Sequence, residues 1–584
     1  MGIPSYFSYL VKNYPHILSK FVAKTRPIDN LYLDCNSILY DVYHKLVKER
    51  ANDIAAVSVA AAIKATVGDA AVKEAAEAND LPKQIIQRTI QKIHEYIHLV
   101  APQKTVYIAF DGVAPVAKIE QQRSRRYKSW YQSEVMKYIY MDAKNNNTDN
   151  NWSTLAITPG TQFMSNLDAQ LNAAFPSNVK NTIPSQSQKA SNTHRIIIVS
   201  GSGDPGEGEH KLFEYIRQNP EKHQAETTII YGLDADLIVL SICHLKYAPN
   251  IFLFRESPQF QMENLEPNAN YLLDIQHLAR VIDINTNDYI VLTFMLGNDF
   301  LPHFPALNIR TGGMDKLLIA YRQLFLNRNH SCDNKSNNES NNDAIAYLTL
   351  TTTNTIHWTN MYRLVAVLAD KEDEYIQEEH KLRNRREFYL PEKTADEQFK
   401  KFEATPTFER SLEKYIFPHH QDWQLRYYAG LFPDQYKSKT SNQTQNGFIQ
   451  DVVHNYFEGL EWTLRYYTHG CPDWRWTYKY SYPPLLQDLR QTLVAKDNQI
   501  IVQFNSDSKP VSKLTQLCSV LPLAGLIYLP SKLQTKLTDN YSHWYRTDYC
   551  FLWAYCRYFW ESHVVMEHID IHVLETLVSE FGPN

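Results

Sequence analysis

The sequence predicts an α/β fold, with a mostly parallel central sheet flanked by helices and a C-terminal region, rich in helices and aromatic residues, packed on it. Short apolar or β-branched runs, typical of strands buried on both faces of a parallel sheet, recur in the first half of the chain. Helical patterns separate these runs, and such alternation is typical of α/β proteins. At 584 residues the chain is too long for one core, so we expect two or three packed domains.

The expected elements follow in chain order. The strands are residues 31–33, 104–110, 195–199 and 227–233. The helices are residues 37–50, the alanine-rich 54–78, 83–100 and 209–218. Two polar, Asn/Ser-rich stretches, 141–156 and 176–194, are expected to be poorly ordered.

The expected domain boundary is a further Asn-rich stretch, Asn327 to Asn342. We predict an α/β domain over residues 1–326, a linker or loop over 327–354 and a helix-rich region over 355–584. The densest aromatic stretch of that last region is EGLEWTLRYYTHGCPDWRWTYKYSYPPLLQDL, residues 458–489. We expect this region to enclose a site on the first domain.

Carboxylates follow every predicted strand, at or just past its carboxyl end. Ligands in open α/β sheets bind at that edge, so we expect these acids to converge there. The six acids are Asp34, Asp111, Glu207, Glu209, Asp234 and Asp236. Asp299, within FMLGNDFLPHFP, is a seventh candidate.

Several ionised carboxylates in one site repel one another. Two unit charges about 4 Å apart repel by about 4 kcal/mol at an effective dielectric of 20. Either several of the acids stay protonated, or hard divalent cations lie among them. Ligands that are all oxygen, without His or Cys, favour Mg²⁺ or Mn²⁺ over zinc. Two such ions about 3.5–4 Å apart form a clamp for in-line phosphoryl displacement, which indicates phosphodiester hydrolysis.

A cationic segment follows Asp111. Lys118, Gln122, Arg125 and Arg126 fall at i, i+4, i+7 and i+8, and so share one face of a predicted helix. A face of this kind, close to a metal-site acid, is suited to gripping a phosphate, because the arginine fork matches phosphate oxygens. Taken alone, the same run equally fits a solvated helix face.

Composition excludes some classes of protein. The net charge of −5 argues against a generic nucleic-acid binder. Seven scattered cysteines without a CxxC pair indicate free thiols in a reducing compartment. There is no run of 18 apolar residues and no signal-peptide core, so we expect a soluble, intracellular protein without a membrane role.

With these residues in place, the chain resembles the eukaryotic 5′→3′ exoribonucleases, the Xrn/Rat family within the flap-endonuclease-like (PIN-related) nucleases. The resemblance covers most of the chain. Its blocks are MGIPSYFSYLVKNYPHI, LYLDCNSILY, AFDGVAPVAKIEQQRSRRYK, ITPGTQFM (157–164), PGEGEHKLFEYIR, YGLDADLIVLSI, LGNDFLPHFPALNI and the aromatic stretch 458–489.

Carried over by position, the resemblance implies a two-ion Mg²⁺ site on all seven acids, with Mn²⁺ expected to substitute. It assigns Lys118, Gln122, Arg125 and Arg126 to a pocket for a 5′-monophosphate. Where the family commonly has a histidine that stacks on the first base, this sequence has Tyr40. The stacking partner is expected to be Trp474 or Trp476, and core packing is the alternative for both.

The resemblance implies processive 5′→3′ hydrolysis of single-stranded RNA that bears a 5′-monophosphate, releasing mononucleotides and sparing capped RNA. The alternatives are a structure-specific DNA or flap nuclease and a catalytically silent RNA-binding scaffold. Gly2 either allows a close backbone approach to RNA or simply precedes a helix. We expect a monomer, and the sequence does not reveal whether a decapping protein binds it. No plain basic nuclear-import run is visible and KLRNRREF is only a weak candidate, so we expect cytoplasmic rather than nuclear residence.

Overall fold

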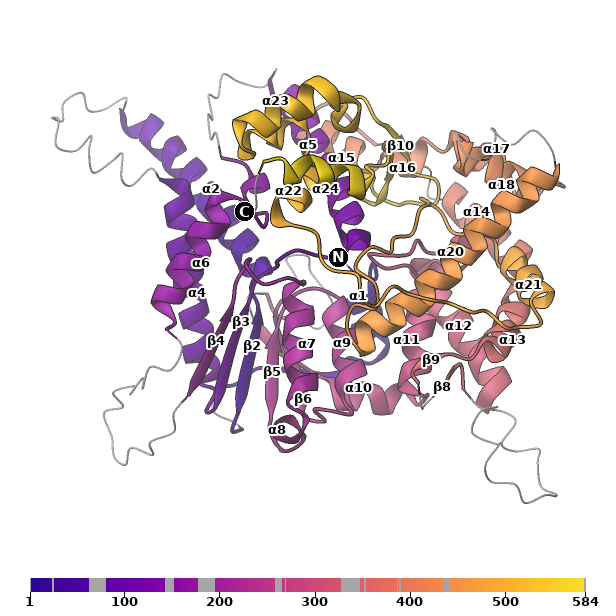
Figure 1. The fold of residues 1–584 in the computed structure, drawn as a ribbon, viewed down its shortest axis with the longest axis horizontal. Coiled ribbons are helices and arrows are strands. Elements are labelled where there is room, and N and C mark those ends of the chain that lie inside the picture. The colour runs from indigo at the N-terminus through magenta and orange to yellow at the C-terminus, as the bar shows by residue number, and fades with distance from the viewer. Residues whose placement is uncertain are drawn as a thin grey trace.

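The computed structural model describes residues 2–23, 26–61, 80–141, 152–176, 195–257, 265–267, 269–326, 347–350, 353–385, 387, 390–433, 436 and 442–581. A central sheet with helices on both faces lies beside a large helical region (Figure 1). The predicted fold class is therefore confirmed. Among the described residues, no helix combines the length and the apolar character needed to span a membrane.

The central sheet has seven strands in the order β1-β7-β6-β5-β2-β3-β4. The strands are β1 (Leu18–Lys20), β2 (Asn30–Asp34), β3 (Thr105–Ala109), β4 (Ile196–Ser200), β5 (Thr228–Tyr231), β6 (Ile251–Glu256) and β7 (Asn270–Asp274). The five strands from β2 to β6 are parallel to their neighbours, whereas β7 is antiparallel to both β6 and β1. All four predicted strands are present, and β1, β6 and β7 were not predicted.

The strand register aligns the carboxyl ends of the parallel strands. Asp34 pairs with Ala109, Ala109 pairs with Ser200, and Leu33 pairs with Tyr231. From β2 the chain continues outward through β3 and β4, and it then returns to the other side of β2 as β5. The edge between β2 and β5 is thus the point where strand order reverses, which is where open α/β sheets bind ligands.

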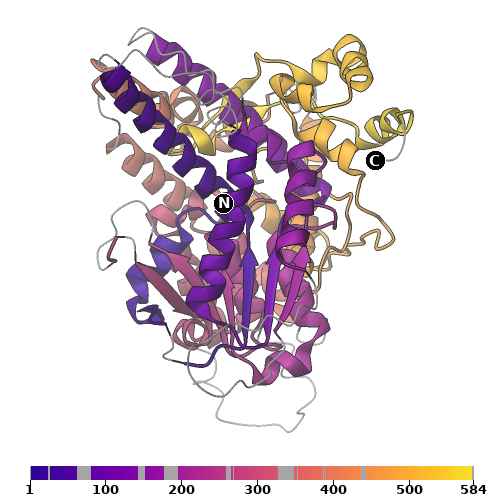
Figure 2. The ribbon, with the colours of Figure 1, turned by 90° about the vertical axis from the view of Figure 1, so that its left-hand side faces the viewer.

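Alternating side chains of the strands pack against two helical layers. Leu31 and Leu33 lie in one apolar cluster and Tyr32 lies in another, because successive strand residues point to opposite faces. The first face carries α2 (Asn36–Ala61), α4 (Leu81–Val100) and α6 (Gln162–Ala174), and Figure 2 shows helices covering it. The second carries α7 (Gly208–Gln218), α9 (Asp236–His244) and α10 (Ile275–Ile282). The two helices predicted over 37–50 and 54–78 are one helix, α2, as far as Ala61; the rest of the second prediction lies outside the described residues.

The remaining helices are α1 (Tyr6–Asn13), α5 (Val116–Met141), α8 (Pro220–Ala225), α11 (Thr286–Phe294), α12 (Gly313–Tyr321), α13 (Trp358–Ala369), α14 (Glu372–Arg385), α15 (Ala395–Glu403), α16 (Thr405–Phe408), α17 (Ser411–Ile416), α18 (Trp423–Leu431), α20 (Asn442–Thr468), α21 (Leu486–Ala495), α22 (Lys513–Val520), α23 (Ser531–Asn540) and α24 (Ile571–Ser579). Two short strand pairs complete the fold: β8 (Thr349–Leu350) with β9 (Thr355–Ile356), and β10 (Cys550–Leu552) with β11 (His563–Val565).

One apolar cluster runs from the sheet into the second region. It contains Tyr6 of α1, Ile230 of β5 and Leu240 of α9, together with Trp462 and Tyr467 of α20. The two regions therefore share a core, and their division into separate domains stays a prediction.

Parts of the predicted mobile and linker stretches are folded. The prediction of poor order is wrong for residues 152–156, because the ring of Trp152 packs on those of Tyr43 and Phe163, with centroids 5.1 and 5.3 Å apart. Leu348 and Thr349 belong to the predicted linker. Their backbone N–H groups donate hydrogen bonds to the carboxylate of Asp288, at 2.8 and 2.9 Å. Residues 142–151, 177–194 and 327–346 lie outside the described part of the chain.

Candidate active site at the carboxyl edge of the sheet

The structure brings all seven predicted acids together at the β2–β5 edge. Asp34 is within electrostatic reach of Asp111, Asp234 and Glu207. Glu209, in the first turn of α7, is likewise close to Asp234 and Asp236. Asp299, from the loop after α11, completes the cluster beside Asp236.

Glycines allow the acids to approach one another. The backbone N–H of Gly208 donates to Asp111 Oδ1 (2.7 Å), and a Cβ at Gly208 would lie 2.9 Å from Asp34 Oδ1. The glycine between Glu207 and Glu209 is thus required by close packing at the start of α7.

Gly2 also lies against the acids. Its φ is +46°, and a Cβ there would lie 2.2 Å from Asp236 Oδ1 and 2.9 Å from Asp234 Oδ1. One of the two predictions for Gly2 was that its backbone lies close to RNA. In the structure the neighbours are these two carboxylates.

The second region contributes directly to the cluster. The hydroxyl of Tyr466, on α20, donates to Glu207 Oε1 (2.9 Å), and the ring of His210 stacks on Tyr466 with centroids 3.8 Å apart. Sequence reasoning missed Tyr466, because nothing in the aromatic stretch distinguishes it from core tyrosines.

Lys118 is the cation that sits within the acid cluster. Its Nζ pairs with Glu207 Oε2 and with Asp299 Oδ2, the latter at 2.7 Å, and all three side chains are at least 90% buried. Burial alone would lower the pKa of Lys118, but the charges of Asp299 and Glu207 outweigh it and hold that pKa well above its usual value. Burial raises the pKa of the Asp299 carboxyl, yet the nearby cations, Lys118 foremost, outweigh burial, so this pKa is lowered.

For Asp34 and Asp236, burial and neighbouring carboxylates outweigh the nearby cations. Burial, together with the charges of Asp111 and Asp234, raises the pKa of Asp34 to about 8. Burial and the charges of Asp234 and Asp299 raise the pKa of Asp236 to about 8 as well. The cluster therefore carries more negative charge than its own cations offset, which favours binding of a proton or a metal cation.

The donor set fits hard divalent cations. Glu209 Oε2 and Asp236 Oδ1 are buried and have no hydrogen-bond partner within the described part of the chain. Carboxylate oxygens of this kind are ligands for Mg²⁺ or Mn²⁺. Among the described residues, no three His, Cys, Asp or Glu side chains already surround a metal-sized point. The metal-binding role of the acids stays a prediction.

The predicted phosphate-binding face lies on α5, as expected, but its members differ in their surroundings. Lys118 points into the acid cluster, and Gln122 is buried with its Oε1 unpartnered among the described residues. Arg126 is buried and donates to Thr158 Oγ1 and to the carbonyl of Ile157 (3.2 Å). Burial lowers the pKa of Arg126 to about 10, so the guanidinium remains charged at neutral pH.

The structure distinguishes the two candidate tryptophans. The indole of Trp476 is half-buried and stacks on that of the core residue Trp462, with centroids 5.1 Å apart. Trp474 is half-buried, its backbone carbonyl accepts from the N–H of Val116 at the start of α5 (2.9 Å), and no described ring stacks on its indole. Tyr40, on α2, is half-buried and lies within electrostatic reach of Arg126. These contacts favour Trp474 as the partner of Tyr40, and both assignments stay predictions.

A doubly covered parallel sheet with a carboxylate cluster at its reversal point, beside a cationic helix, is typical of metal-dependent nucleases. Residues 1–257 match the family model described as XRN 5′-3′ exonuclease N-terminus, and residues 276–417 and 417–581 match the Xrn1 helical domain. The chain belongs to the XRN 5′-3′ exonuclease family, and the resemblance seen in its sequence is confirmed.

Curated relatives match over nearly the whole chain. The 5′-3′ exoribonuclease 1 of Saccharomyces cerevisiae is 26% identical, over 93% of this chain and 40% of its own length. The human 5′-3′ exoribonuclease 1 is 26% identical, over 92% of this chain and 32% of its own length. The 5′-3′ exoribonuclease 2 of Gallus gallus is 23% identical, over 100% of this chain and 70% of its own length. The chain thus spans less than half the length of the first two relatives.

Proposed function

We propose that this protein is a processive 5′→3′ exoribonuclease that hydrolyses single-stranded RNA with a 5′-monophosphate and releases mononucleotides. The observation that carries the proposal is the convergence of seven carboxylates at the β2–β5 edge beside α5. Relatives named 5′-3′ exoribonuclease match over more than nine-tenths of the chain, which supports the same reaction class.

The seven acids would hold two Mg²⁺ ions, which when bound supply activation of water and charge stabilisation for the leaving 3′-oxygen. The chain's own residues prepare that site. Tyr466 fixes one oxygen of Glu207, and Lys118 neutralises charge between Glu207 and Asp299. Gly2 and Gly208 leave room for the carboxylates to meet.

The α5 face would select the 5′ end of the substrate. Arg125 and Arg126 offer forks for phosphate oxygens, and Gln122 offers a buried amide. Thr158 and the carbonyl of Ile157 hold Arg126 in place without neutralising it. A first base stacked between Tyr40 and Trp474 would gain about 1–3 kcal/mol from stacking. A cap or a triphosphate would be too bulky for such a pocket.

The test is a time course on labelled RNA that carries a monophosphate, a triphosphate or a cap, with and without Mg²⁺. We expect mononucleotides from the monophosphorylated RNA alone, and only with Mg²⁺. The double variant Asp234→Asn, Asp236→Asn should lose hydrolysis and keep RNA binding. Its matched control is Asp370→Asn, Asp548→Asn, two side chains that are each 70% exposed. Turnover by the first variant equal to that of the control would refute the metal site.

Parallel digestion of single-stranded RNA, single-stranded DNA and a flap duplex separates the proposal from a DNA or flap nuclease. Failure to cut any of them, with RNA binding retained, would indicate the silent scaffold. A monomeric state, a decapping partner and cytoplasmic residence stay predictions.

A further inference from the structure

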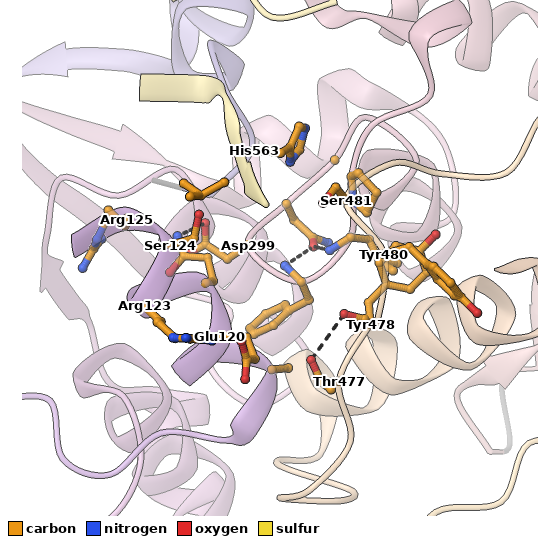
Figure 3. Close-up of a pocket in the computed structure, with 18 of the residues that line it drawn as sticks. Glu120, Arg123, Ser124, Arg125, Asp299, Thr477, Tyr478, Tyr480, Ser481 and His563 are labelled. Carbon is orange, nitrogen blue, oxygen red and sulfur yellow. Dashed lines mark hydrogen bonds between the residues drawn. The ribbon is translucent and has the colours of Figure 1, made fainter. Parts of the chain in front are cut away.

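A large cavity adjoins the acid cluster on a different face of α5. Its volume is about 940 Å³, at the upper end of the range of about 300–1,000 Å³ typical of ligand pockets. Asp299 and Gly2 line it, and both also border the carboxylate cluster. Figure 3 shows Glu120 and Ser124 of α5 on one side of the cavity and Tyr478 and Tyr480 on the other.

The cavity and the predicted phosphate-binding residues lie on different sides of α5. Arg126 donates to Thr158 and lies within electrostatic reach of Tyr40 and Asp111, whereas Ser124 and Glu120 line the cavity. Arg125 belongs to the predicted phosphate pocket and also lines the cavity. The two spaces therefore meet at Arg125 and Asp299.

The walls offer the groups that a nucleotide needs. Aromatic surface comes from Phe300, Tyr478 and Trp560. Within the described part of the chain, Ser562 Oγ and Asn298 Nδ2 are buried and have no hydrogen-bond partner, and Ser562 is 1% exposed. Two neutral imidazoles also line the cavity, since burial lowers the pKa of His303 to about 4 and that of His563 to about 3.

Most cations of the wall are already engaged by protein groups. Lys128 donates to the carbonyls of Trp560 (2.8 Å) and Ser562 (2.7 Å), and Arg475 pairs with Glu575 (2.6 Å). Arg123 and Arg310 likewise have partners. Among the described residues, Arg125 and Lys479 line the cavity without a hydrogen-bond or ion-pair partner for their side-chain nitrogens.

We propose that this cavity binds the nucleoside 5′-monophosphate product and gives it a way out while the RNA stays bound. The proposal rests on the proposed function, because a processive enzyme must release each nucleotide without freeing the strand that fills the entrance. The aromatic surface suits the base, the unpartnered polar atoms suit the ribose hydroxyls, and Lys479 suits the phosphate.

Equilibrium dialysis of the full chain with adenosine 5′-monophosphate in EDTA tests the site directly, without hydrolysis. Ser481→Phe fills the cavity, and Ser129→Phe, on the exposed side of α5, is the matched control. We expect Ser481→Phe to lower the amount of bound nucleotide to that held by the 5′-phosphate pocket, Lys479→Ala to weaken binding in the cavity about tenfold, and Ser129→Phe to bind like the wild-type protein. Lys479 is exposed, so its variant keeps the test valid if Ser481→Phe does not fold.

Absence of wild-type binding at millimolar nucleotide, or equal binding by all variants, would overturn the proposal. With 5′-phosphorylated RNA, Ser481→Phe should keep the single-turnover rate within about twofold of the wild-type rate and lower the steady-state rate. A fall in both rates would place the cavity on the RNA path and also overturn it. If the wild-type protein cuts no RNA, the proposed function fails, while dialysis still decides whether the cavity binds the nucleotide.

Discussion

Replacing Lys118 by methionine removes the cation between two buried carboxylates while keeping most of the side-chain volume. Glu207 and Asp299 are 4% and 5% exposed, so water cannot replace the ammonium group. Removing one partner of a buried ion pair costs about 3–5 kcal/mol, a large part of a typical unfolding free energy of about 5–15 kcal/mol. We expect a loss of this size in EDTA. Mg²⁺ should stabilise Lys118→Met more than the wild-type protein, because the ion supplies the missing charge.

Denaturant unfolding followed by far-ultraviolet circular dichroism, in EDTA and in Mg²⁺, measures both effects. The matched control is Lys137→Met on the same helix. Lys137 and Glu134 are 68% and 46% exposed, and such surface pairs are worth at most about 1 kcal/mol. Equal losses for the two variants, or no additional Mg²⁺ stabilisation of Lys118→Met, would refute the account of Lys118.

The other predictions concern the pH dependence of stability, phosphate selection and the N-terminal glycine. Because the pKa values of Asp34 and Asp236 are raised to about 8, the folded metal-free protein keeps protons that the unfolded chain loses above about pH 4. Its unfolding free energy should therefore fall between about pH 4 and pH 8, and a flat profile in EDTA would contradict this. Thr158→Val should release Arg126 and reduce the preference for 5′-monophosphate over 5′-hydroxyl RNA in competition assays, whereas Thr158→Ser should preserve it; equal ratios for the two variants would count against the role of Thr158. Gly2→Ala should abolish hydrolysis without lowering the melting temperature by more than a few degrees, because its Cβ would lie 2.2 Å from Asp236 Oδ1; normal turnover would exclude this clash.

The sequence was most informative where short buried strands end in acids. The period and length of those runs predicted β2 to β5, and parallel pairing then placed Asp34 and Asp234 at the same edge of the sheet, within electrostatic reach of each other. The antiparallel edge was missed for a physical reason. β1 is three residues long and mostly exposed, and it pairs with β7 more than 250 positions later in the chain. No local sequence pattern therefore indicates this strand.

The site was predicted less completely than the sheet, because several of its contacts join distant segments. The hydrogen bond from Tyr466 to Glu207 spans 259 positions, and Thr158 contacts Arg126 from a segment recognised only as a family block. The choice between Trp474 and Trp476 depends on which indole already stacks on a core ring, and their similar sequence surroundings do not reveal that. The residues that line the cavity come from both halves of the chain, and no sequence motif in either half indicates the cavity.

The shared core limits how the chain can be divided. A fragment that stopped after residue 326 would expose the apolar faces of α9 and α11 that α20 covers, and Glu207 would lose the hydroxyl of Tyr466. Such a fragment should aggregate when expressed alone. Any shortened version of this protein would thus have to retain α20, because this helix covers the apolar faces of α9 and α11.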